Sequence, residues 1–468
     1  MSTEKKVKKA GKKWKEILEE PPKVSATELM RDHDYMGTLA KQGGSIKTWH
    51  DRLCILHQGK LYYYVSQKDT KPKGMINIQG LICEGVELAK KKYGIKIISP
   101  HRTYYLACED NNEQERWIKE INNSSMRNSD YRLHVVDPDL SEDCTFHDLQ
   151  KAIDQAQDGD HIVLRSGIYK LNETLVIKKP LTIRGVYPDM DLVHLCSCEG
   201  VKTIIKVDAF NDNLTVQELE KQRLLGIDKN VVTIEHLTLT QNASKDTILF
   251  YENTSCLEVM SGICKLDHVM IRGGYGHGII VNNRLNRKQK SNNGTAMTAV
   301  KATNSESKES FSFSLSLTTN GDGNHSHHDQ AQSPDIRSIS SSLSSSSLPS
   351  DMPVKKPPIE PTKLIVSECH IECNKIHGIK FCDDSQGEIS KSIFQKNEGH
   401  AIICTDDSDV KIERSVFSNH SKNAIYLRST KTITVFKNKM HANGLGGKAH
   451  IAVAADAAPC ASEENEFL

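Results

Sequence analysis

The chain has 468 residues, of which 26% are charged and 37% hydrophobic, a composition typical of folded domains joined to polar segments. A formal net charge of +1 provides no global field for DNA or RNA, so we expect no nucleic-acid partner. The sequence shows neither a secretory leader nor an apolar run of about 18 residues, which predicts a cytoplasmic protein without a membrane span.

The first segment, residues 1–33, is predicted to be a disordered or helical basic arm. Pro21 and Pro22 end any helix that forms there. A lysine run is attracted to an anionic membrane surface, but it also suits nuclear import or a plain solvated arm. We therefore expect reversible association with the plasma membrane and leave a nuclear location open. The lysines of the run are Lys5, Lys6, Lys8, Lys9, Lys12, Lys13 and Lys15.

Residues 34–125 alternate short β-type runs with turn signals and end in one amphipathic helix. Turns are expected at residues 42–45, 59–60 and 71–74, where glycine, lysine and proline gather. A helix is expected over residues 112–121 because apolar residues recur there at helical spacing. The pattern predicts a small domain of short strands closed by this helix. The apolar residues of the helix are Trp117, Ile118 and Ile121.

The motif Gly37-x-Leu39-x-Lys41-Gln-Gly-Gly44, followed by Lys47-Thr-Trp49, Arg52 and Trp117, resembles the pleckstrin-homology domain. It looks most like the cytohesin and dual-adaptor members, which bind 3-phosphorylated inositol lipids. The resemblance implies a small barrel capped by one helix and a lipid head-group site at one rim. The residues that match the binding positions are Lys41, Lys47, Arg52, Tyr63 and Lys73.

The chemistry of these residues suits such a ligand. An inositol polyphosphate carries several dianions close together, so its site needs converging cations, with arginine as a bidentate fork and lysine as a point charge. The backbone of Gly43-Gly44 can approach a phosphate because no Cβ intrudes. His50 stands where strong binders carry lysine, which weakens the site or makes it pH-sensitive. Binding of any anionic lipid, or of protein only, stays open as an alternative.

The second half of the chain repeats every 23 residues. Apolar residues recur in three columns, which indicates stacked coils that each add one rung to a parallel sheet. A polar column at one turn predicts a ladder of side-chain hydrogen bonds. The apolar columns are Val366, Ile389, Ile412 and Val435; Ile371, Phe394, Phe417 and Met440; and Ile379, Ile402 and Ile425. The polar column is Asn374, Asn397, His420 and Asn443.

The repeat also locates an insertion. The runs Lys265–Ile271 and Gly276–Ile279 match residues within Thr362–Ile379 at an offset of 100, which is one coil plus 77 residues. We therefore expect a β-helix over 131–455, interrupted by a disordered serine-rich insertion at 284–361 and followed by a tail at 456–468. A helix over Thr145–Ile153 is expected to cover the open end of the stack. The insertion contains Ser333-Pro334 and Arg337-Ser-Ile-Ser340, which predict kinases as partners.

The segment Gly159-Asp-His-Ile-Val-Leu164, which begins the first coil, and the His-Gly-Ile repeats resemble right-handed parallel β-helices of the pectin-lyase type. The closest likeness is to the intracellular repeats of F-box substrate adaptors. The sequence contains no F-box, so the resemblance does not imply ubiquitin-ligase assembly. The expected fold class is thus mainly β: a pleckstrin-homology barrel capped by one helix, followed by a right-handed parallel β-helix solenoid.

Extracellular proteins of the second type cleave acidic polysaccharides, but the hydrolase motifs are out of order here. Asp383 and Asp406 stack at a spacing close to that of a retaining carboxylate pair, yet Asp-Asp-Ser is also ordinary turn chemistry. His277, His377 and His400 form another column, whose linear arrangement does not suit tetrahedral zinc. We therefore predict no enzyme activity, no catalytic residue, no metal and no cofactor.

These observations predict a membrane-recruited adaptor. Its first domain binds phosphoinositides through Lys41, Lys47, His50, Arg52, Tyr63 and Lys73, and its β-helix binds an unknown protein partner. A protein-only intracellular scaffold is the alternative, and a carbohydrate-active enzyme is the third hypothesis.

Overall fold

The computed structural model describes residues 21–44, 46–140, 143–209, 231–242, 254–283, 362–444 and 449–467. The Lys5–Lys15 run and the serine-rich insertion lie outside these ranges, and so do the predictions made for them. Within the described ranges, no helix combines the length and the apolar character needed to cross a bilayer.

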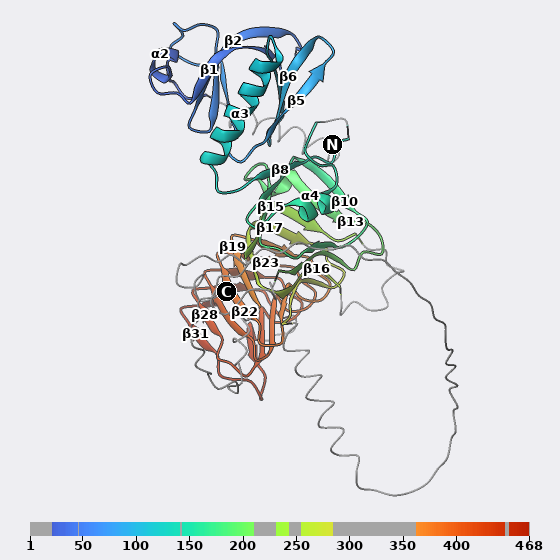
Figure 1. Ribbon diagram of the computed structural model, residues 1–468. Coiled ribbons are helices and arrows are strands. Elements are labelled where there is room, and N and C mark those ends of the chain that lie inside the picture. Colours follow the sequence, from blue (N-terminus) through green and yellow to red (C-terminus); the bar gives the residue numbers. More distant parts are fainter. Residues whose placement is uncertain are drawn as a thin grey trace, which may run out of the picture. The chain divides into compact units, whose positions relative to one another are not determined.

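The amino-terminal domain is an antiparallel sheet of seven strands closed by one long helix (Figure 1). The strands lie in the order β4-β3-β2-β1-β7-β6-β5. This arrangement confirms the predicted pleckstrin-homology fold. The elements are β1 (Tyr35–Gln42), β2 (Trp49–His57), β3 (Lys60–Tyr64), β4 (Gly74–Asn77), β5 (Cys83–Leu88), β6 (Lys91–Ile98), β7 (Thr103–Ala107) and α3 (Asn111–Arg127).

Helix α3 buries Trp117 and Ile121 against the sheet, as its apolar spacing predicted. It begins where the Asp110 carboxylate caps the backbone N–H of Glu113 at 2.8 Å. It continues beyond the predicted end because two buried serines hold its last turns. Their hydroxyls donate to the Asp34 carboxylate and to the Leu81 carbonyl: Ser124 Oγ at 3.0 Å and Ser125 Oγ at 2.6 Å.

The end of the predicted basic arm packs on this domain. The short helix α2 (Ala26–Leu29) buries its two terminal residues against Ile55, Tyr62 and Tyr64. The Tyr64 hydroxyl donates to the Val24 carbonyl at 3.0 Å. The domain therefore includes residues that precede its first strand.

The second domain is built from two long parallel sheets, of 17 and eight strands among the described residues. The eight-stranded sheet contains β11 (Leu175–Ile177), β14 (Thr203–Asp208), β16 (Ser255–Ser261), β18 (His277–Val281), β21 (Ile379–Phe381), β24 (Ile402–Asp406), β27 (Ile425–Ser429) and β30 (Ile451–Val453). The first part of the larger sheet contains β8 (Leu133–Val136), β9 (His161–Leu164), β10 (Gly167–Leu171), β12 (Thr182–Gly185), β13 (Val193–Ser197), β15 (Val231–Thr240) and β17 (Ile263–Arg272). A 3₁₀ turn, η1 (Met190–Leu192), precedes β13.

The larger sheet continues with the strands drawn in orange and red in Figure 1. They are β19 (Lys363–Ser367), β20 (His370–Glu372), β22 (Gln386–Ser390), β23 (Ile393–Gln395), β25 (Asp409–Glu413), β26 (Val416–Ser418), β28 (Thr434–Phe436), β29 (Lys439–His441), β31 (Ala461–Glu463) and β32 (Glu466–Phe467). The last two strands pair with β28 and β29, so the sheet extends past residue 455, where the sequence placed its end.

The register confirms the 23-residue columns. Val366 pairs with Ile389, Ile371 with Phe394, and Ile379 with Ile402, and the same steps repeat in the following coils. The offset of 100 is also present, since β17 pairs with β19 and β20, and β18 pairs with β21. The column members are fully buried, and the rings of Phe394 and Phe417 stack with centroids 4.9 Å apart.

The polar column forms the predicted ladder. The Oδ1 atom of Asn397 accepts from the backbone N–H of Asn374 at 3.0 Å and from its Nδ2 at 2.8 Å. The backbone N–H of Asn397 donates to Nδ1 of His420 at 3.2 Å, and the N–H of His420 donates to Oδ1 of Asn443 at 3.3 Å. The buried polar groups of each turn are thus hydrogen-bonded to those of the next turn.

A helix does cover the start of the solenoid, but it begins later than predicted. Helix α4 spans Leu149–Gln155, and Asp148 rather than Thr145 is its cap. The N–H of Thr145 donates instead to the Val135 carbonyl at 3.0 Å, because this segment pairs with β8. A helix start is weakly specified when several capping residues stand close together.

We expect Asp148→Ala to lower the free energy of unfolding by about 1 kcal/mol, because its carboxylate accepts from the Lys151 N–H at the helix start. Asp154→Ala, in the last turn of the same helix, is the control and should cost less. Thermal unfolding followed by circular dichroism measures both. Equal midpoints for the two variants would show that the cap is unimportant.

Candidate functional site: a cationic rim on the amino-terminal domain

The pairing of β1 with β2 sets which side chains share a face of the barrel. Leu39 lies opposite Arg52, and Lys41 lies opposite His50. Because side chains alternate along a strand and opposite residues share a face, Lys41 and Arg52 project to the side where Leu39 and Cys54 are buried. The two cations therefore lie at the rim end of the inward-facing side.

Lys41 is held against two aromatic rings. Its Nζ atom lies 4.5 Å from the ring centroid of Tyr63 and 5.5 Å from that of Tyr104, and it donates to the Gln42 carbonyl at 3.3 Å. The residue is only 9% exposed, so the aliphatic stem is packed and the ammonium group is fixed in direction. Two of the predicted residues, Lys41 and Tyr63, are thus in contact.

The thiol of Cys54 is buried on the same face of the sheet as Lys41 and Arg52. Burial raises the pKa of Cys54 to about 12, and both cations act on the same thiol in the opposite direction. The register of β1 and β2 thus places both residues on one face of the barrel.

Arg102 adds a cation that the sequence interpretation did not assign to the site. It ends the turn between β6 and β7, and its Cζ lies 4.4 Å from the ring centroid of Tyr104. A Cβ atom built on Gly44 would come within 2.6 Å of its Nη1, so the guanidinium reaches the first loop. The adjacent basic pair His101-Arg102 between two strands was the available signal. We call Lys41, Arg52 and Arg102 the cationic cluster.

The other predicted residues border the cluster. Lys47 lies exposed in the loop that Arg102 reaches, and the exposed His50 places Nε2 3.0 Å from Thr48 Oγ1. Lys73 is exposed, and its backbone N–H donates to the Tyr63 carbonyl at 2.8 Å. These three residues extend the positive rim beyond the contacts of the cluster.

Glycines give the rim its shape. A Cβ on Gly74 would lie 1.9 Å from the Tyr63 hydroxyl, so only glycine allows that ring to lie across β4. A Cβ on Gly43 would come within 2.2 Å of the Ile46 carbonyl, so the first loop is tightly folded. Converging cations beside an exposed backbone are suited to bind a multiply charged phosphate ester.

The histidine column and the aspartate pair of the solenoid both make contacts within the solenoid itself. Imidazoles of His277, His377 and His400 stack with centroids 5.2 and 5.1 Å apart, and burial first, then the neighbouring histidines, lowers the pKa of His377 to about 2. The Asp406 carboxylate accepts from the Asp383 N–H at 3.2 Å, and both aspartates have positive φ. These aspartates therefore shape turns. Among the described residues, no group of three or more His, Cys, Asp or Glu is arranged to hold a metal ion.

Comparison with known families identifies both domains. A family model for the PH domain matches residues 33–126, and one for the right-handed beta helix region matches residues 354–467. The chain therefore carries a PH domain followed by a right-handed β-helix.

Individual relatives match the PH-domain segment. A PH domain-containing protein of Dictyostelium discoideum is 33% identical over 102 residues, which cover 21% of this chain and 22% of that protein. Mouse cytohesin-4 is 29% identical over 122 residues, which cover 21% of this chain and 31% of that protein. The chain therefore spans less than a third of the length of these two relatives. The solved structure of the C-terminal PH domain of pleckstrin in complex with D-myo-Ins(1,2,3,5,6)P5 is 31% identical to the matched part of this chain. The match covers 20% of this chain and 94% of that structure, with a TM-score of 0.18.

Proposed function

We propose that the protein is a non-enzymatic adaptor that binds phosphoinositides, chiefly 3-phosphorylated ones, through the rim of its PH domain. The supporting observation is that the strand register places Lys41 and Arg52 on one face at the rim, where Lys41 packs on the ring of Tyr63. Lys47, His50, Tyr63 and Lys73 extend this site. The β-helix presents its repeated outer surface to a protein partner, so that the lipid recruits the partner to the plasma membrane.

The binding chemistry follows from the charges. A phosphate on the inositol ring accepts a bidentate pair of hydrogen bonds from Arg52 and a third bond from Lys41. The rings of Tyr63 and Tyr104 hold Lys41 in place before the ligand arrives, which reduces the entropy lost on binding. Neighbouring phosphates on the same ring meet Lys47 and Lys73 at the edges of the rim.

We expect Arg52→Ala to weaken binding to vesicles that contain phosphatidylinositol 3,4,5-trisphosphate by about tenfold, because one charge-assisted contact is lost. Vesicle co-sedimentation of the full chain measures the effect. Arg127→Ala is the matched control, because this arginine lies in the same domain, is 61% exposed and pairs only at the surface with Asp34.

The composition of the vesicles separates the alternatives. Binding that is equal on phosphatidylserine vesicles of the same total charge would indicate a general preference for anionic lipids. If wild type and Arg52→Ala sediment equally with the phosphoinositide vesicles, the proposed site is refuted. Absence of sedimentation for both would favour the protein-only scaffold.

A further inference from the structure

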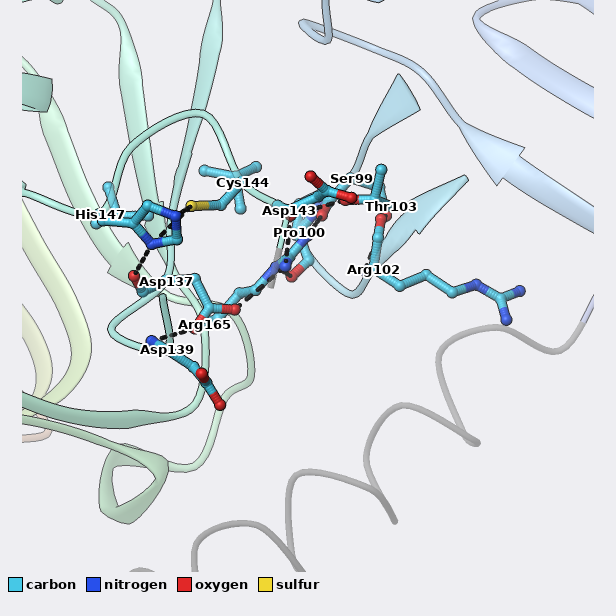
Figure 2. A network of polar contacts seen from close by, with 12 residues as sticks. Ser99, Pro100, Arg102, Thr103, Asp137, Asp139, Asp143, Cys144, His147 and Arg165 are labelled. Carbon is cyan, nitrogen blue, oxygen red and sulfur yellow. Dashed lines mark hydrogen bonds and ion pairs between the residues drawn. The ribbon is translucent and has the colours of Figure 1, made fainter. Parts of the chain in front are cut away.

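A buried arginine of the β-helix binds the turn that carries Arg102 (Figure 2). Arg165, which follows β9, donates from Nε to the Pro100 carbonyl at 3.2 Å and from Nη2 to the Ser99 carbonyl at 3.0 Å. Its Nη1 donates to the Asp137 carboxylate at 3.1 Å and to the Asp143 carbonyl at 2.9 Å. The ion pair with Asp137 keeps the Arg165 guanidinium in place. Two hydrogen bonds from the same guanidinium hold carbonyls of the PH domain.

The turn itself is closed at its base. The Ser99 N–H and hydroxyl both donate to the Arg102 carbonyl, at 3.0 and 2.8 Å. At its tip, the His101 ring stacks on Tyr187 of the β-helix with centroids 5.4 Å apart. The backbone of Arg102 is therefore fixed by contacts on the preceding three residues, each of which meets the β-helix.

The side chain of Arg102 leaves this turn on the opposite side from the polar network, as Figure 2 shows. It passes over Tyr104 to reach Gly44 in the first loop of the rim. The same four-residue turn thus has its carbonyls bound by Arg165 and its last side chain in the cationic cluster. A shift of the turn would move the Arg102 guanidinium relative to Lys41.

We propose that the β-helix is part of the inositol phosphate site: Arg165 is a positioning residue that fixes the Ser99–Arg102 turn so that Arg102 meets a phosphate of the head group. This inference rests on the proposed function of the PH domain and deepens it. Affinity for the head group then depends on the folded start of the β-helix, so the two domains act as one lipid-binding unit.

The test is a double-mutant cycle on the full chain, with soluble inositol 1,3,4,5-tetrakisphosphate as the probe and calorimetry as the readout. Arg165→Lys keeps the charge beside Asp137 but loses the planar fork that holds two carbonyls. We expect it to weaken binding about fivefold in the wild-type background and by less than about 1.5-fold in an Arg102→Ala background, because the two residues act through one contact. Arg428→Lys, a 63% exposed arginine late in the β-helix, is the matched control.

Each outcome decides between the hypotheses. Binding that depends on Arg52 but is unchanged by Arg165→Lys refutes the inference alone. An equal loss in both backgrounds also refutes it, because Arg165 would then act on general stability. If wild type does not bind the probe, the proposed function fails and the inference fails with it.

A second variant covers the case in which Arg165→Lys does not fold. Thr103→Val is isosteric and removes the hydrogen bond that the Thr103 hydroxyl donates to the Asp143 carbonyl at 2.7 Å. It should weaken binding about twofold, again only when Arg102 is present. Additive losses of Thr103→Val and Arg102→Ala would overturn the inference in that case.

Discussion

Asn397→Leu is expected to lower the free energy of unfolding of the β-helix by about 3 to 5 kcal/mol. The side chain is 1% exposed, and it accepts from the backbone N–H and from Nδ2 of Asn374. Its own Nδ2 donates to the Ile371 carbonyl at 3.3 Å. Leucine has a similar volume but leaves these groups without partners in a dry turn, and each unsatisfied group costs about 1 to 3 kcal/mol.

Two spectroscopic probes separate the domains in this experiment. The three tryptophans, Trp14, Trp49 and Trp117, all precede the β-helix, so their fluorescence reports on the amino-terminal part. Far-ultraviolet circular dichroism is dominated by the more numerous strands of the β-helix. We expect urea to unfold the variant earlier by circular dichroism while the tryptophan transition stays close to that of wild type.

Glu398→Gln is the matched control, because it changes the neighbouring residue and removes only an exposed ion pair with Lys375. An exposed pair of this kind contributes at most about 1 kcal/mol. Should Asn397→Leu unfold at the same urea concentration as Glu398→Gln, the ladder would have no stabilising role.

The sequence predicted the β-helix because its repeat is a property of spacing. Each coil must place the same side chain on the same rung, so Ile371, Phe394 and Phe417 recur at a fixed step whatever the details of the turns. The asparagine ladder was predictable for the same reason. The insertion between β18 and β19 was located by the offset and by its serine-rich composition.

The rim was predictable in part. Lys41 and Arg52 lie on adjacent strands whose register follows from one short loop, so their placement on one face could be predicted from the sequence. Arg102 lies at least 50 positions from both. The sequence does not show which hairpin turn approaches the first loop. Strand β5 carries no clear sequence signal, because Glu84 and Glu87 leave it largely exposed, without the alternation of a half-buried strand.

The contact of Arg165 with Ser99 and Pro100 was not predictable. A buried ion pair between Arg165 and Asp137 has no periodic signature, and its acceptors in the PH domain are backbone carbonyls, which any residue could provide. Short motifs and periodicity describe single domains. A contact between domains depends on which turns face each other, and this requires coordinates.

His420→Asn is expected to make the β-helix less sensitive to acid. His420 occupies the one position of the ladder that is not asparagine, and burial, as the largest effect, lowers its pKa from 6.5 to about 4. Its Nδ1 accepts the N–H of Asn397, so this nitrogen carries no proton in the folded state. Protonation would place two donors against each other in a site that is 1% exposed.

The sign of the effect follows from proton binding. Between pH 6.5 and about 4 the unfolded chain holds a proton on His420 that the folded chain does not, so the free energy of unfolding falls as pH falls. From pH 7.5 to 5.0 this residue alone lowers it by roughly 2 kcal/mol. Other buried histidines, such as His377, add to the loss in wild type and remain in the variant.

Asparagine at position 420 can accept from Asn397 through its own Oδ1, as Asn397 does for Asn374, and it does not titrate. We therefore expect the variant to match wild type to within about 1 kcal/mol at pH 7.5 and to exceed it by roughly 2 kcal/mol at pH 5.0, in urea unfolding followed by circular dichroism. His441→Asn, at the exposed end of strand β29, controls for the change of residue type. An identical fall in stability with pH for wild type and His420→Asn would mean that the buried imidazole is not what links the ladder to protons.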